Sequence, residues 1–281
     1  MTKTLLVCLD GKFVPHEDAH IAISDGGFLF GETLFETLKA HGNNILLAQR
    51  HLERLETSAQ LLDFPFDRHQ IERSLDQLAA GLTAPTSRIR LTISRGAFTG
   101  LTWPSPQAAH FLLTAVPYTE LTDAQRQAGA ACVFAPNQRV NPLSHLAQMK
   151  RGNYADCLYA FNHARAAGAG EALFRDPDGY ILEGSTTNVF AVIDDRLITA
   201  PPDNLVLDGI MRREVIKTAA ELGIQTSERK LHTDELAEAD EMFLTNSLID
   251  ILPLSSIDGL PIKRGDCWKS LLKTLWMRIE T

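Results

Sequence analysis

Cysteine is scarce in this sequence, and the cysteines that occur are isolated from one another. The chain has 281 residues and four cysteines, none in a C-x-x-C pair: Cys8, Cys132, Cys157 and Cys267. A zinc site or a disulfide framework needs closer, repeated spacing. The nine histidines also lack metal-ligand spacing such as H-E-x-x-H. We therefore expect no metal and a reducing, cytoplasmic location.

Long apolar runs and blocks of positive charge are also absent. The apolar run near the N-terminus is interrupted by Asp10 and Lys12, and no later run has the length of a transmembrane helix. The net charge is −8, and the lysines and arginines are scattered along the chain. Nucleic acid and membranes are therefore poor candidate partners, and a small-molecule substrate is expected.

The composition indicates a folded protein with two modest domains. Hydrophobic residues make up 44% of the chain, which is enough for a substantial core. Strand patterns are grouped with helix patterns and do not alternate regularly with them, so we expect an α+β fold. The polar stretch from Tyr118 to Gly129 is the expected boundary. It separates a small N-terminal α+β domain, residues 1–120, from a larger C-terminal domain, residues 121–281.

Hydrophobic periodicity predicts the main elements. The predicted helices cover residues 49–62, 69–82, 154–167, 211–222 and 267–279. The predicted strands are two short strands within residues 4–14, followed by 88–94, 111–117, 131–134, 171–175, 180–183, 189–193, 196–199 and 241–245. Glycines interrupt residues 21–35, which we expect to form a loop that crosses a site.

Two distant residues suit the chemistry of pyridoxal 5'-phosphate (PLP). Lys150 precedes a predicted helix, and Glu183 ends an apolar strand just before a run of small polar residues. A carboxylate beside the pyridine nitrogen of PLP keeps that nitrogen protonated, and the ring then accepts electrons from a carbanion. Taken singly, Lys150 also fits a solvated surface residue and Glu183 a hairpin cap.

Three further segments could bind a phosphate. Gly209 precedes a predicted helix, so the backbone N–H groups of Ile210 and Met211 would be available to an anion. The strand at 241–245 ends in polar residues that include Ser247, and Arg54 offers a bidentate guanidinium. Each segment also has a plain structural interpretation, as a surface charge, a turn or a helix cap.

Taken in order along nearly the whole chain, the motifs resemble the class IV aminotransferase superfamily, the PLP enzymes of fold type IV. The motifs are Phe30–Thr37, His51–Leu55, Ile93–Gly96, Lys150 with Asn153, Glu171–Leu173, Glu183–Ser185, Asn188–Phe190, Gly209–Arg212 and Ala239–Ser247. This resemblance implies a PLP enzyme of two domains, with a smaller N-terminal α/β sandwich and a larger C-terminal pseudo-barrel. It also implies a homodimer.

The resemblance also implies individual roles. Lys150 is the lysine that binds PLP covalently and transfers protons, and Glu183 is the partner of the pyridine nitrogen. The implied phosphate ligands are Arg54, the N–H groups of Ile210 and Met211, and Ser247, while Leu207 packs on the cofactor ring. Met211 stands where many relatives have threonine, so only a backbone contact is expected there.

Among the subclasses, the motifs look most like aminodeoxychorismate lyase, which converts 4-amino-4-deoxychorismate to 4-aminobenzoate and pyruvate in folate biosynthesis. In that interpretation Thr37 positions the substrate. The stretch after Ser94-Arg95-Gly96 departs from the lyase pattern and also lacks the carboxylate trap of D-amino-acid aminotransferases. An aminotransferase of D-amino or branched-chain amino acids is the alternative, and a non-catalytic PLP-binding protein is a third. Arg95 and His145 are candidates for binding the substrate carboxylate.

Overall fold

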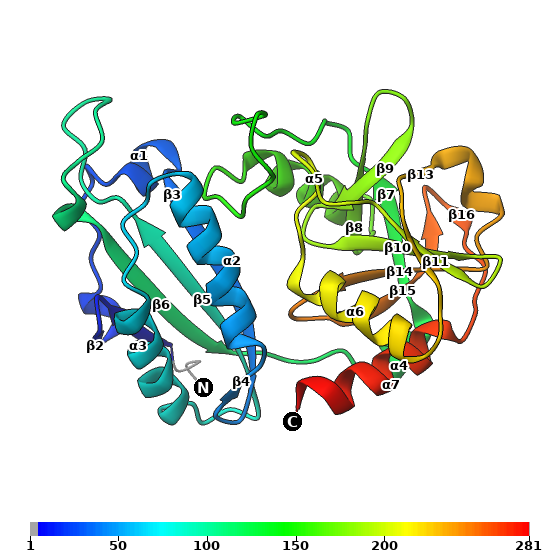
Figure 1. Ribbon diagram of the computed structural model, residues 1–281, viewed down its shortest axis with the longest axis horizontal. Coiled ribbons are helices and arrows are strands. Elements are labelled where there is room, and N and C mark those ends of the chain that lie inside the picture. Colours follow the sequence, from blue (N-terminus) through cyan, green and yellow to red (C-terminus); the bar gives the residue numbers. More distant parts are fainter. Residues whose placement is uncertain (1–4, 281) are drawn as a thin grey trace. The chain divides into compact units, whose positions relative to one another are not determined.

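The computed structural model describes residues 5–280, which form two compact units (Figure 1). Unit 1 contains residues 5–120 and the segment Met149–Tyr154, and unit 2 contains residues 121–148 and 155–280. The sequence prediction assigned Met149–Tyr154 to the C-terminal domain, but the contacts of this segment group it with unit 1. That the two units are separate structural domains stays a prediction.

Unit 1 is built on one antiparallel sheet whose strands follow the order β2-β1-β6-β5-β3-β4. The strands are β1 (Leu6–Leu9), β2 (Lys12–Val14), β3 (Thr33–His41), β4 (Asn44–Ile45), β5 (Thr86–Ser94) and β6 (His110–Pro117). The predicted strands of this half are confirmed to within two residues. The central pair β3 and β5 stays in register over nine residues of each strand, from Thr33 opposite Ser94 to His41 opposite Thr86.

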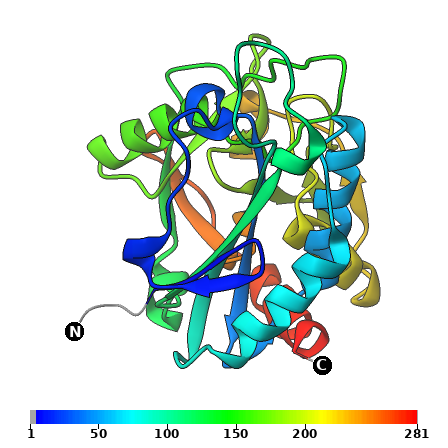
Figure 2. The ribbon, with the colours of Figure 1, turned by 90° about the vertical axis from the view of Figure 1, so that its left-hand side faces the viewer.

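Two amphipathic helices, both predicted, cover one face of this sheet (Figure 2). The helices and short 3-10 turns of unit 1 are η1 (His16–Asp18), α1 (Gly26–Phe30), α2 (Ala48–Leu61), α3 (Arg68–Ala80) and η2 (Pro106–Ala108). Leu52 and Leu55 of α2 and Ile71 and Leu75 of α3 are buried, at the spacing that one helical face requires. Burial of this face fixes the helices on the sheet.

The segment predicted as a loop, residues 21–35, instead contains α1 and the start of β3. Strand β3 escapes detection because both of its faces are buried over much of its length and because the buried residues include Glu36 and Lys39. An alternation of apolar and polar residues is therefore missing. The glycine-rich part is irregular where predicted: Gly31 ends α1 at a φ of 66°, and a Cβ there would lie 2.8 Å from the Asn153 nitrogen.

Unit 2 contains a ten-stranded mixed sheet with the path β12-β11-β10-β14-β15-β7-β8-β9-β13, and β16 pairs with β15. Its strands are β7 (Ala130–Phe134), β8 (Glu171–Arg175), β9 (Tyr180–Gly184), β10 (Asn188–Ile193), β11 (Arg196–Thr199), β12 (Thr226–Glu228), β13 (Leu231–His232), β14 (Glu241–Asn246), β15 (Asp250–Ile257) and β16 (Leu260–Pro261). The β15–β7, β7–β8 and β11–β12 pairs are parallel, and the others are antiparallel.

Helices complete unit 2 and contact the strands of its sheet. They are α4 (Asp123–Ala128), α5 (Ala155–Ala166), α6 (Ile210–Glu221), η3 (Thr233–Ala237) and α7 (Cys267–Ile279). The predictions for α5, α6 and α7 are confirmed, whereas β15 was missed because Asp250 and Pro253 interrupt its apolar pattern. Helices α6 and α7 pack on each other, α6 also contacts β14, and α7 also contacts β15. Helices and strands in both units confirm the α+β fold class.

None of the helices within residues 5–280 is both long enough and apolar enough to cross a membrane.

Truncating a buried leucine of α2 tests how the first sheet is covered. Leu55 is 1% exposed, so Leu55→Ala should leave a cavity and lower the free energy of unfolding by about 2–5 kcal/mol. Leu61 lies on the same helix and is 49% exposed, so Leu61→Ala is the matched control and should cost less than about 0.5 kcal/mol. Urea denaturation measures both, and equal losses would contradict this packing.

Candidate active site

Main-chain contacts to β3 hold the segment that carries Lys150. The Phe35 N–H donates to the Lys150 carbonyl at 2.9 Å, and the Gly152 N–H donates to the Thr33 carbonyl, also at 2.9 Å. A Cβ on Gly152 would lie 2.0 Å from Thr33 Oγ1, so the approach requires glycine. These contacts do not involve the lysine side chain, and they fix its backbone beside the strand.

Two aromatic rings surround the Lys150 amine within unit 1. Lys150 Nζ lies 4.7 Å from the centroid of the Phe35 ring and 5.8 Å from that of Tyr154. The two rings meet edge to face, with centroids 5.6 Å apart. Aromatic faces attract a cation, so this arrangement holds the amine in place while the residue stays partly exposed.

Thr37 and Arg90 share the sheet face on which Phe35 lies. Residues 35 and 37 point to the same side of β3, and Thr37 is directly opposite Arg90 on β5. The Arg90 guanidinium carbon lies 3.7 Å from the centroid of the Phe35 ring, and the residue is exposed. Arg90 and Lys150 therefore both contact one aromatic ring, and Arg90 is a cation that the sequence prediction did not single out.

Arg54 is held in a buried charge cluster. Its Nε donates to Glu36 Oε1 at 2.8 Å and its Nη2 donates to Glu36 Oε2 at 2.6 Å, while His51 Nδ1 lies 2.7 Å from Glu36 Oε2. Burial alone would raise the pKa of Glu36, but Arg54 and His51 lower it to about 2. Burial also lowers the pKa of His51, against the opposing effect of Glu36. The cluster fixes the orientation of the Arg54 guanidinium.

The sequence contained a signal for this cluster. Glu36 lies between the buried residues Leu34 and Leu38 on a strand, and a carboxylate at a core-facing position needs a charged partner. His51 and Arg54 are three residues apart on one helix, so they share a face. Only the spacing of His51 and Arg54 can be recognised from the sequence alone, because the strand that buries Glu36 follows from the fold.

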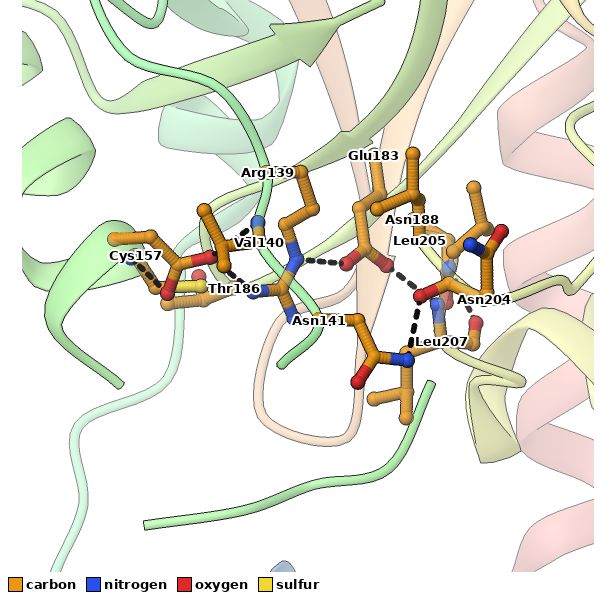
Figure 3. A network of polar contacts seen from close by, with 12 residues as sticks. Arg139, Val140, Asn141, Cys157, Glu183, Thr186, Asn188, Asn204, Leu205 and Leu207 are labelled. Carbon is orange, nitrogen blue, oxygen red and sulfur yellow. Dashed lines mark hydrogen bonds and ion pairs between the residues drawn. The ribbon is translucent and has the colours of Figure 1, made fainter. Parts of the chain in front are cut away.

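In unit 2, Glu183 is held at the end of β9 by two donors (Figure 3). Arg139 Nε donates to Glu183 Oε1 at 2.8 Å, and the Leu207 N–H donates to Glu183 Oε2 at 2.8 Å. The side chain of Glu183 is 6% exposed. The structure thus brings together two predicted site residues, Glu183 and Leu207, although the contact is to the Leu207 main chain.

Arg139 connects Glu183 to a second carboxylate. Its Nη1 donates to Asp156 Oδ2, and the side chains of Arg139 and Asp156 are 7% and 9% exposed. Burial opposes the charge on Arg139, but Glu183, Cys157 and Asp156 raise its pKa above the usual value. Nothing in the sequence marks Arg139 or Asp156, because one lies in an irregular loop and the other near a helix start.

Helix α6 begins with main-chain donors that suit the phosphate of PLP. Gly209 caps the helix without a side chain, and Ile210 and Met211 form the first turn. The free N–H groups of a helix's first turn favour an anion. A Cβ on Gly209 would lie 2.0 Å from Asn188 Oδ1, and Asn188 Nδ2 donates to the Leu207 carbonyl at 2.9 Å. Asn188 therefore fixes the start of α6 close to β10.

The end of β14 carries a buried hydroxyl that also fits a phosphate. Thr245 pairs with Asn188 in the sheet and is 1% exposed, and its Oγ1 has no hydrogen-bond partner among the described residues. A buried hydroxyl without a partner is costly, and a ligand oxygen would supply one. Ser247 follows two residues later and is partly exposed. The donors of unit 2 fit PLP, and the roles of Ile210, Met211 and Ser247 stay predictions.

The Arg95 guanidinium already contacts other groups, which leaves it unsuited to bind a substrate carboxylate. Its Nε donates to Glu32 at 3.1 Å, both terminal nitrogens donate to main-chain carbonyls, and the residue is 5% exposed. The guanidinium also lies 4.1 Å from the ring centroids of both Phe64 and Trp103. His145, the other candidate, is exposed in unit 2.

Within residues 5–280, we find no cluster of three or more histidine, cysteine, aspartate or glutamate side chains that could hold a metal ion.

Comparison with protein families gives a match over most of the chain. The family model described as amino-transferase class IV matches residues 33–257. A Methanocaldococcus jannaschii protein named as a branched-chain-amino-acid aminotransferase is 31% identical, covering 96% of this chain and 97% of its own. The aminodeoxychorismate lyase of Bacillus subtilis is 27% identical, covering 90% of this chain and 87% of its own.

Solved structures of the same groups are similar to this chain. The branched-chain aminotransferase of Escherichia coli has a TM-score of 0.89 at 26% identity, covering 98% of this chain and 94% of its own. The 4-amino-4-deoxychorismate lyase of Pseudomonas aeruginosa has a TM-score of 0.86 at 27% identity, covering 98% of this chain and 100% of its own. A branched-chain aminotransferase from T.th., complexed with N-(5'-phosphopyridoxyl)-L-glutamate, has a TM-score of 0.88 at 28% identity, covering 98% and 93%.

The Glu36 cluster predicts a specific dependence of stability on pH. The folded-state pKa of Glu36 is depressed from 4.5 to about 2, so its contribution to stability is complete above pH 4.5 and is lost as pH falls toward 2. Glu36→Gln should lower the free energy of unfolding by about 3 kcal/mol at pH 7, because Arg54 loses its counter-charge. This difference from wild type should shrink as pH falls from 4.5 toward 2.

Glu53→Gln is the matched control, because Glu53 forms an exposed pair with Arg50 on the same helix. It should change the free energy of unfolding by less than about 1 kcal/mol at any pH. Denaturant unfolding at several pH values gives these differences. A difference between wild type and Glu36→Gln that does not change with pH would contradict the ionised Glu36 cluster.

Proposed function

Because this chain belongs to the class IV aminotransferase family, whose enzymes use PLP, we propose that it transfers amino groups from branched-chain amino acids to a 2-oxo acid. The sequence motifs favoured aminodeoxychorismate lyase. The similarities support the alternative better, because the aminotransferase from Methanocaldococcus jannaschii is 31% identical and the lyase from Bacillus subtilis is 27% identical. We therefore place transamination first.

The observation that carries the proposal is the pair of cations on the Phe35 ring. Lys150 Nζ lies 4.7 Å and the Arg90 guanidinium carbon lies 3.7 Å from the centroid of that ring. Amino acids and 2-oxo acids both carry a carboxylate, and an exposed guanidinium is suited to bind one. In our proposal, Arg90 binds a substrate carboxylate while the Lys150 amine reaches the reacting carbon.

The remaining residues would hold the cofactor. When bound, PLP supplies an electron sink that stabilises negative charge on a substrate carbon that has lost its proton. Within unit 2, Glu183 would contact the ring nitrogen and the first turn of α6 would bind the phosphate. Arg54 of unit 1 stays a predicted phosphate ligand. Lys150 Nζ would take the proton from the α-carbon of the amino donor, acting as a general base, and would then deliver it, acting as a general acid, to the cofactor carbon that keeps the amino nitrogen.

Lyase activity is the second candidate. It is supported by the similarity to the Pseudomonas aeruginosa lyase, because the match covers 100% of that chain. Thr37 lies opposite Arg90 on the sheet face that also carries Phe35, a position that suits the predicted contact with the substrate. Activation by PLP and proton transfer by Lys150 would be common to both reactions, so only the substrate and product distinguish them.

A two-part assay separates the candidates. Purified protein loaded with PLP should convert L-leucine, L-valine or L-isoleucine with 2-oxoglutarate into glutamate and the matching 2-oxo acid, measured by chromatography. D-alanine with 2-oxoglutarate tests the D-amino-acid alternative in parallel. Aminodeoxychorismate without an amino acceptor should yield no 4-aminobenzoate. Release of 4-aminobenzoate together with inactivity on all amino acid pairs would overturn the proposal in favour of the lyase.

Lys150→Ala is the control for this assay. It should lose activity on every substrate, because it removes the amine that transfers the proton, while the phosphate-binding groups remain. Absence of activity in both wild type and Lys150→Ala, with PLP bound to each, would support the non-catalytic alternative.

Replacement of Arg90 tests the carboxylate contact. Arg90→Gln should lower kcat/KM for the amino donor by about 10- to 100-fold, since it removes a charge-assisted contact to the substrate. Arg88→Gln is the matched control. Arg88 lies two residues away on the same strand, whereas Arg90 is the residue that contacts the Phe35 ring. Arg88→Gln should therefore change kcat/KM by less than about threefold. Equal effects of the two substitutions would remove Arg90 from the site.

The proposal also includes a cytoplasmic homodimer. Helix α1 exposes Phe28, Leu29 and Phe30 in unit 1, with Phe28 74% exposed. Contiguous exposed apolar side chains often mark a contact with another protein, and a second copy of the chain would bury them.

A further inference from the structure

Asp156 is a second buried carboxylate that no sequence motif assigned to the site. It is the second residue of α5, and its Oδ2 accepts hydrogen bonds from Arg139 Nη1 and from the Val140 N–H, the latter at 3.0 Å. Its Oδ1 accepts from the Cys157 N–H at 2.8 Å. The carboxylates of Asp156 and Glu183 are connected through the one guanidinium of Arg139.

The charges of Glu183, Arg139 and Asp156 explain why a second carboxylate matters. Glu183 and Arg139 alone would form a neutral pair, and a neutral pair attracts a protonated ring nitrogen weakly. Asp156 adds a second negative charge to the one guanidinium, so the three groups together carry one net negative charge. All three side chains are less than 10% exposed, so water screens them little.

Asp156 lies at a position in the fold that suits a negative charge. Asp156 lies in the first turn of the twelve-residue helix α5, where the helix dipole stabilises a negative charge. The titratable groups that face Arg139 are Glu183, Cys157 and Asp156, and all come from unit 2. The net negative charge is therefore built from residues of one compact unit.

We propose that Asp156 is a positioning residue that acts through Arg139 on Glu183, so that Glu183 keeps enough negative charge to hold a protonated ring nitrogen of PLP. This inference rests on the proposed role of Glu183. Asp156 and Glu183 share the single positive charge of Arg139. Because part of that charge offsets Asp156, Arg139 neutralises Glu183 only in part. A purely structural Asp156 would instead only anchor residue 140 to the start of α5.

The test compares four variants of the full chain: Asp156→Asn, Asp156→Glu, Glu183→Gln and Glu241→Gln. Glu241 is the matched control, since its buried carboxylate accepts the N–H groups of Cys267 and Trp268 and so serves the start of α7. Three quantities are measured: the Kd for PLP from a titration of the PLP-free protein, the pH midpoint of the absorption change of bound PLP, and the thermal unfolding temperature.

Asp156→Asn should raise the Kd for PLP about tenfold and move the absorption midpoint to lower pH, because removing a negative charge disfavours a protonated group nearby. Glu183→Gln should shift both quantities further in the same direction. Asp156→Glu keeps the carboxylate, so its Kd for PLP and its absorption midpoint should stay within about threefold of the wild-type values. Glu241→Gln should lower the unfolding temperature and leave the Kd and the midpoint unchanged.

The outcomes separate this inference from the proposed function. If Asp156→Asn lowers only the unfolding temperature while Glu183→Gln changes the Kd and the midpoint, Asp156 is a structural anchor and the inference is overturned alone. If Glu183→Gln changes neither quantity, Glu183 does not contact the ring nitrogen, and the proposed cofactor site and the inference both fail.

Discussion

The Glu183 carboxylate lies in the interior of unit 2, where a charge without a partner would be costly. The Arg139 guanidinium and the Leu207 N–H satisfy it, each at 2.8 Å. These two contacts connect the end of β9, the loop that carries residue 139 and the segment before α6. The start of α6 and the carboxylate are thus held in a fixed relation before any cofactor binds.

The same requirement orders other parts of both units. In unit 1, Glu36 fixes Arg54 by two hydrogen bonds and is supported by His51. In unit 2, Glu171 is 3% exposed and accepts hydrogen bonds from the Ser185 hydroxyl and the Thr186 N–H, so it anchors the loop that follows Glu183. Each buried carboxylate therefore holds a polar segment in a single arrangement, which is the preorganisation that a cofactor site needs.

Membership of the class IV aminotransferases accounts for the residues that the proposed reactions share. In the proposed site, Lys150 and Glu183 would serve transamination and lyase chemistry equally, because in both reactions PLP would supply an electron sink for negative charge on a substrate carbon. The choice between them depends on which groups bind the rest of the substrate. Arg90 and Thr37 lie opposite each other on β5 and β3, and in the proposed site they would contact that part of the substrate.

Most local elements and the cofactor could be predicted from the order of the amino acids alone. Helices α2, α3, α6 and α7 follow from their apolar periodicity, and the ordered motifs around Lys150 and Glu183 identified a PLP enzyme of class IV. Periodicity works there because one face of each helix is buried and the other is exposed to water. It failed for β3, where both faces are buried and Glu36 and Lys39 are among the buried residues.

Only the three-dimensional fold decides which charged groups contact one another, because no local sequence pattern encodes these pairs. Arg139, Asp156 and Glu183 are far apart in the chain, as are Arg90, Phe35 and Lys150. Arg95 followed a recognisable motif, yet the fold buries its guanidinium between two rings and leaves it unsuited to a substrate. The physical reason is that periodicity reports the burial of a residue relative to its neighbours in sequence, whereas a charge pair depends on which strands and loops the fold brings side by side.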